Sequence, residues 1–131
     1  LYVVGAEDNF GVSLHDIWIY DLKNPALPEL IGNWSEEYIH DIEVYNNKLY
    51  GAAIYSGQFY ILDVSDKAAP TTIKIHHTGG VMTHDCAVTY DENYLISFRA
   101  FGQIWKINSS MISLVSSFET EGMTLPYLHE R

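Results

Sequence analysis

Residues 39–45, IHDIEVY, decide the fold because they recur at residues 83–89 as THDCAVT, an offset of 44 residues. A third copy of the pattern begins at residues 128–130, LHE, 45 residues after the second. Residues 57–61, GQFYI, and residues 102–106, GQIWK, repeat at the same offset of 45. One register at this spacing predicts tandem structural units of a single kind.

The unit from His40 to Thr83 contains four apolar runs with turn residues between them. The runs are residues 41–45, 49–55, 58–64 and 71–76, and the turns contain Asn, Gly, Ser, Asp and Pro. Residues of both parities are apolar in the third run, whereas a strand with one wet face alternates. The pattern therefore predicts a four-stranded antiparallel meander that is covered on both faces.

A repeat of this length and strand content predicts an all-β fold built of β-propeller blades. We expect an incomplete blade at residues 1–39, blades at 40–83 and 84–128, and the start of the next blade at 129–131. The first unit carries six extra residues, which we place in a loop around residues 7–11. Because propellers close with about four to eight blades, we expect this chain to be a fragment of a larger ring. A β-sandwich is the alternative, but it does not predict the recurring His-Asp register.

Composition agrees with a packed β protein and limits its partners. The chain of 131 residues is 47% hydrophobic and holds ten Tyr, five Phe and three Trp, a mixture that favours strands. The formal charge of −10 disfavours nucleic acid and anionic membrane surfaces as partners. No apolar run reaches the roughly 20 residues of a membrane-spanning helix, so we expect no membrane span in this segment. One cysteine leaves the redox compartment open.

Two stretches have the same pattern: an apolar strand that ends at or next to an aspartate, followed by a short loop that contains proline. They are residues 61–70, ILDVSDKAAP, and residues 19–28, IYDLKNPALP. The structural repeat motif therefore has four aspartates, two at these strand ends and two after the recurrent histidines: Asp21, Asp63, Asp41 and Asp85.

Together these stretches resemble the LVIVD repeat of the choice-of-anchor B family of bacterial surface proteins, over nearly the whole chain. The resemblance implies a propeller-like fold, secretion and attachment to the cell surface, and it brings no shared enzymatic activity. The third unit departs from the pattern, because residues 105–110, WKINSS, lack the aspartate-valine pair and the later proline. This departure weakens any expectation that every loop has the same role.

Three histidines recur once per unit at the start of the predicted innermost strand: His40, His84 and His129. A closed ring would bring them toward a common axis, and imidazole is a good ligand for zinc, copper or iron. The acidic residues that follow them could orient their tautomers: Asp41, Asp85 and Glu130. Alternatively, each His-Asp pair ties a strand end to its neighbour by hydrogen bonds. Repetition favours this alternative, because every unit needs such a bond whereas a metal needs one cluster.

Two further features could carry chemistry. Glu7, Asp8 and Asn9 place carboxylate and amide oxygens in one loop, a donor set that suits calcium, although the spacing is not that of an EF-hand. Cys86 lies two residues from His84 on the same side of a strand, and a thiol beside an imidazole could be a nucleophile. Because the preceding unit has isoleucine at the equivalent position, we predict instead that Cys86 is a small buried side chain.

These patterns favour a non-catalytic scaffold, secreted or at the cell surface, that presents its end loops or exposed Tyr and Trp side chains to a protein or glycan. The remaining blades of the same chain or a larger assembly are also expected partners. One alternative is a metal-dependent enzyme with an axial histidine cluster, and another is a structural component of an extracellular assembly. We expect no cofactor in the scaffold, and a transition metal or calcium in the alternatives.

Overall fold

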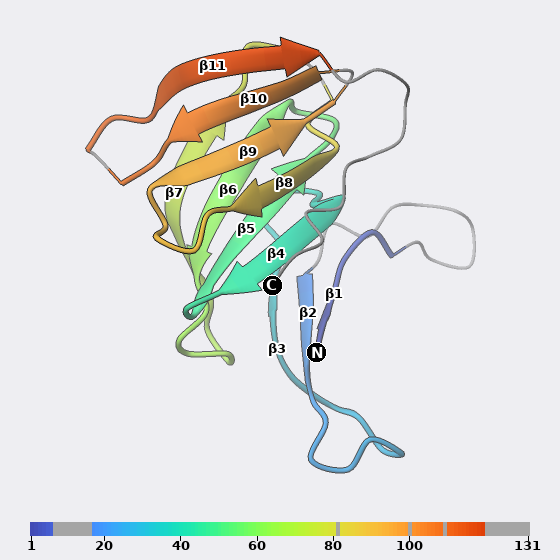
Figure 1. Ribbon diagram of the computed structural model, residues 1–131. Coiled ribbons are helices and arrows are strands. Elements are labelled where there is room, and N and C mark those ends of the chain that lie inside the picture. The colour runs from blue at the N-terminus through green and yellow to red at the C-terminus, as the bar shows by residue number, and fades with distance from the viewer. Residues whose placement is uncertain (7–16, 81, 100, 109, 120–131) are drawn as a thin grey trace.

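The computed structural model describes residues 1–6, 17–80, 82–99, 101–108 and 110–119 (Figure 1). Strands are the only regular elements among these residues, and they form three antiparallel sheets of three or four strands, which confirms the all-β prediction. The described strands do not close into a ring. Nothing in the described part of the chain is a helix long and apolar enough to cross a membrane.

Each sheet is a meander in which strands pair with their neighbours in sequence. The first sheet contains β1 (Tyr2–Val3), β2 (Ile17–Asp21) and β3 (Glu29–Trp34). The second contains β4 (Asp41–Tyr45), β5 (Lys48–Ala53), β6 (Gln58–Asp63) and β7 (Thr71–His77). The third contains β8 (Asp85–Val88), β9 (Tyr94–Phe98), β10 (Phe101–Lys106) and β11 (Ser113–Glu119).

The second sheet follows the four apolar runs that the sequence predicts between residues 40 and 83. Its second strand ends at Ala53 and not at residue 55, because residues 54–57 form the turn to β6. Asn46 and Asn47 both have positive φ, at 47° and 58°. Two left-handed residues in a two-residue loop are typical of a type I′ hairpin, and asparagine tolerates this conformation. The Asn-Asn pair therefore sets the register of β4 and β5, in which Tyr45 faces Lys48.

The second sheet has an apolar core on each face, as the mixed parity of its strands predicts. Toward the first sheet it presents side chains that cluster with Ile17 and Trp34: Leu49, Ala53, Tyr60, Leu62 and Val64. Toward the third sheet it presents side chains that cluster with Cys86, Leu95 and Trp105: Tyr50, Ala52, Phe59 and Ile61. The third sheet lies across the second with β8 beside β4 (Figure 1). Burial on both faces of one sheet is the main source of stability here.

The loops that follow β2 and β6 contain the same two hydrogen bonds from backbone N–H groups to side chains. Asp21 and Asp63 each accept a hydrogen bond from the backbone N–H two residues later, at 2.9 and 2.8 Å. Three residues further on, Asn24 and Asp66 each accept a bond of the same kind from the backbone N–H two residues later, at 3.2 and 3.0 Å. These successive Asx turns fold the proline-bearing loops of the first two sheets in the same way.

Candidate functional site

His40 and His84 occupy matching places in the second and third sheets. Each immediately precedes the first strand of its meander. The backbone N–H of His40 donates to the carbonyl of Ala52, and that of His84 donates to the carbonyl of Phe98, both at 2.8 Å. Each bond extends the pairing of the first two strands by one residue. The two histidines therefore lie at the same end of adjacent strands, β4 and β8.

The two imidazole rings meet across the boundary between the sheets. Their Nε2 atoms are 3.2 Å apart, and the ring centroids are 4.4 Å apart with the planes at 71°. The Nε2–H of one ring donates to the Nε2 of the other. The Nδ1 atom of His84 is buried and has no hydrogen-bond partner among the described residues. Burial and the nearby His84 lower the pKa of His40, and the carboxylate of Asp41 only partly opposes this shift, so the neutral imidazole is favoured.

The carboxylates that follow the histidines bind their own strands. Oδ1 of Asp41 accepts a hydrogen bond of 2.7 Å from the backbone N–H of Ile42, and Asp85 accepts one from the backbone N–H of Cys86. Burial and then the charge of Asp41 raise the pKa of Asp85 to about 6. The aspartates therefore bond within their own strands, and the bonds that tie each strand end to its neighbour come from the backbone N–H groups of His40 and His84. Orientation of the imidazoles by carboxylates stays a prediction.

The larger metal clusters expected from the sequence depend partly on residues that the structure does not describe. His129 of the predicted axial cluster lies outside the described residues, and so do Glu7, Asp8 and Asn9 of the predicted calcium loop. Within the described ranges, no three or more His, Cys, Asp and Glu side chains are placed to hold one metal ion. The described part of the predicted cluster is thus a pair of histidines.

Cys86 is a core residue. It is 2% exposed and belongs to the cluster between the second and third sheets. Burial raises the pKa of its thiol well above the ordinary value, and the carboxylates of Asp85 and Asp41 add to this effect. Because the thiolate is the nucleophilic form, this environment suits a packing role and disfavours catalysis.

Polar contacts join the second and third sheets at the end opposite the histidines. Glu92 in the β8–β9 turn accepts hydrogen bonds from Lys48 Nζ at 3.1 Å and from the Tyr50 hydroxyl at 3.0 Å. Further along the boundary, the backbone N–H of Val88 donates to Oε2 of Glu43 at 2.6 Å. Desolvation raises the pKa of Glu92, but the bonds from Lys48 and Tyr50 outweigh it and the net pKa is lowered. No sequence pattern indicated this network, because its side chains belong to different units and to no repeated motif.

A cleft of about 360 Å³ opens beside this network, between the second and third sheets. Its walls combine two lysines, acidic and amide groups, a tyrosine and three isoleucines: Lys48, Tyr50, Ile61, Ile73, Lys74, Asp91, Glu92, Ile107 and Asn108. The ammonium group of Lys74 spans the cleft and donates to the carbonyl of Ile107 at 2.9 Å. Mixed polar and apolar walls are typical of sites for small polar ligands.

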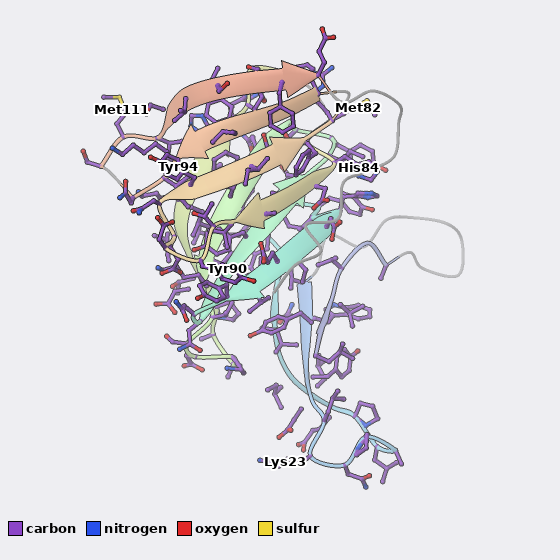
Figure 2. All side chains as sticks on the ribbon, in the orientation of Figure 1. Lys23, Met82, His84, Tyr90, Tyr94 and Met111 are labelled. Atoms are coloured by element: carbon purple, nitrogen blue, oxygen red, sulfur yellow. The ribbon has the colours of Figure 1, made fainter. Side chains whose placement is uncertain are left out.

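Exposed tyrosines lie at both ends of the sheets, but two of the three tryptophans are core residues. Tyr55 is 66% exposed and Tyr90 is 57% exposed, whereas Trp34 and Trp105 are 4% and 6% exposed. The expectation of exposed tryptophans is therefore wrong for these two, because both indoles pack between sheets. Tyr90 directly precedes the cleft residue Asp91 and lies at the opposite end of β8 from His84 (Figure 2).

A scan against protein-family models matched none of them to this chain, and a search of curated proteins found no match either. The geometry of the two ends of the sheets is therefore the basis for assigning a function.

Proposed function

We propose that this chain is part of a non-catalytic β-propeller scaffold, secreted or displayed at the cell surface, that binds a glycan. The supporting features are the equivalent positions of His40 and His84, the matching loops after β2 and β6, and the two apolar cores of the second sheet. Sheets stacked in this way are what successive propeller blades require. The resemblance to LVIVD-repeat surface proteins supports the surface location.

The cleft between the second and third sheets is the observation that carries the binding proposal. Lys48 and Asn108 offer donors, Asp91 offers acceptors, and Ile73 offers an apolar wall. Sugar hydroxyls need closely spaced donors and acceptors, and the C–H faces of sugar rings pack on apolar groups such as Ile73. A protein partner would need a larger surface, so the concave shape favours a glycan. The charge of −10 favours a neutral glycan over an acidic one.

Screening on a printed array of neutral and acidic oligosaccharides, followed by titration with the best neutral one, tests this proposal. We expect Ile73→Ala, which removes apolar surface from the wall of the cleft, to weaken binding about 10-fold, which corresponds to about 1.4 kcal/mol. Ile75→Ala is the matched control, because Ile75 is similarly exposed on the same strand, β7, but does not line the cleft. Binding of no neutral oligosaccharide, or equal losses in both variants, would contradict a glycan site at the cleft.

A further inference from the structure

The distance between the Nε2 atoms of His40 and His84 is the distance expected for two ligands of one metal ion. Two imidazole nitrogens on a tetrahedral zinc ion, each about 2.0–2.1 Å from the metal, are about 3.3 Å apart. The observed separation is 3.2 Å. The two nitrogens are therefore already separated by about the distance that one cation requires.

We propose that His40 and His84 form a two-histidine site for a divalent transition-metal ion of the Zn²⁺ type, which bridges the second and third sheets. Imidazole nitrogen is a preferred ligand for such ions. Both histidines are only half-buried, so water can reach the metal and complete its coordination. The site needs neither the cleft nor a glycan, so it stands or falls independently of the proposed function.

Binding requires a change of tautomer and no net loss of protons. In the metal-free pair one ring carries its proton on Nε2 and shares it with the Nε2 of the other ring. When both Nε2 atoms bind the metal, that proton moves to Nδ1 of the same ring, and both rings stay neutral.

The surroundings of the pair set the strength of the site. Metal-binding histidines usually donate their second N–H to an acceptor, whereas Nδ1 of His84 has no partner among the described residues. Among the described residues no further His, Cys, Asp or Glu side chain is placed to join the two histidines around one ion, so water supplies the remaining ligands there. We therefore expect reversible binding that is weaker than that of a closed four-ligand zinc centre.

The consequence for the fold is a cross-link between sheets. His40 precedes β4 and His84 precedes β8, so the metal would hold the ends of two strands that belong to different meanders. A ligand that binds only the folded state adds RT ln(1 + [L]/Kd) to the free energy of unfolding, so the unfolding midpoint rises with the logarithm of the ligand concentration once the site is saturated. Zinc should therefore stabilise this chain.

Titration of the chain with zinc chloride, followed by calorimetry and thermal unfolding, tests the site. We expect one equivalent of zinc and a higher unfolding midpoint for the wild type. His40→Gln and His84→Gln should each weaken zinc binding at least about 10-fold and remove the rise in midpoint. His77→Ala is the matched control, because His77 is an exposed histidine on β7 of the second sheet, and it should keep both effects.

Copper(II) binding to the wild type gives a test that needs no variant. Electron paramagnetic resonance of the one-equivalent complex should show two imidazole nitrogens on the metal. One nitrogen or none would overturn the proposal, as would the absence of zinc binding to the wild type. Zinc affinity that is unchanged in both glutamine variants, or lost in His77→Ala, would also overturn it.

Discussion

The second and third sheets have the same strand order, yet their strands differ in burial. In the second sheet, β5 and β6 bury residues of both parities, and the outer strand β7 is exposed at every other position. In the third sheet, the equivalent outer strand β11 is exposed throughout, although it contains Leu114, Val115 and Phe118. Apolar side chains in both sheets thus depend on neighbours for burial. The second sheet has a neighbour on each face, whereas the described residues cover only one face of the third.

Replacing one leucine by alanine in the second sheet and one in the third should give the largest difference in the free energy of unfolding. Leu62 is fully buried against the first sheet, whereas Leu114 on β11 is 49% exposed. We expect Leu62→Ala to lower the free energy of unfolding by about 2–5 kcal/mol and Leu114→Ala by less than about 1 kcal/mol. Chemical denaturation of both variants measures the difference. Equal losses would mean that Leu62 and Leu114 are equally buried, which would contradict the difference in burial between the second and third sheets.

Replacing one glycine by alanine in the first sheet and one in the third should give a smaller difference in the free energy of unfolding. A Cβ at Gly32 would overlap the carbonyl oxygen of Lys67 and lie 2.9 Å from Cα of Ala68, in the loop of the second sheet. A Cβ at Gly102 would overlap the ring of Phe118, a partly exposed side chain that can turn away. We expect Gly32→Ala to cost about 1–3 kcal/mol.

Gly102→Ala should cost clearly less than Gly32→Ala in the same denaturation experiment. A larger loss for Gly102→Ala would indicate that Phe118 is held in place by a further layer, which the described residues do not include.

Removal of a polar tie between the second and third sheets should have a comparable or smaller effect. Val88 is 8% exposed, and its backbone N–H donates to the carboxylate of Glu43. Glu43→Ala leaves this donor without its partner, so we expect a loss of about 1–2 kcal/mol. Hydrogen exchange of the Val88 amide should accelerate relative to amides of β2 in the first sheet. Unchanged exchange at Val88 would show that this contact does not hold the sheets together.

The smallest expected effect is the loss of stability in Glu92→Gln, and this loss should depend on pH. Its pKa is lowered in the folded chain, so its stabilising contribution is present above the unfolded pKa and is lost as the pH falls through the folded pKa. Glu92→Gln should cost about 0.5–1 kcal/mol at neutral pH and less in acid, since the wild-type contact is then already lost. Unfolding midpoints measured from neutral to acidic pH test this. A loss for Glu92→Gln that stays the same from neutral to acidic pH would contradict this expectation.

The sequence was sufficient to predict the four strands of the second sheet, apart from the end of β5, the turn at residues 46–47 and the burial of Cys86. These features depend on local turn chemistry and on alternation along a single strand. The recurrence of His40 and His84 also predicted that their side chains converge, because equivalent positions in stacked units lie side by side.

The cleft and the network around Glu92 could not be predicted in the same way. Lys48 and Glu92 become neighbours only through the angle and offset at which two sheets stack, and neither residue belongs to a repeated motif. The burial of Trp34 and Trp105 has the same cause, since each indole fills the space between two sheets. Which residues meet across a sheet boundary depends on the stacking and not on the pattern within a strand.

Packing of the second sheet between two neighbouring sheets is the feature on which the fold depends. A nuclear Overhauser spectrum of the aromatic protons tests it most directly, because Trp34 meets Tyr60 from the first sheet and Trp105 meets Phe59 from the third, with ring centroids 5.4 and 6.1 Å apart. We predict cross-peaks for both pairs in one sample. Cross-peaks for neither pair, or for one pair alone, would contradict this packing.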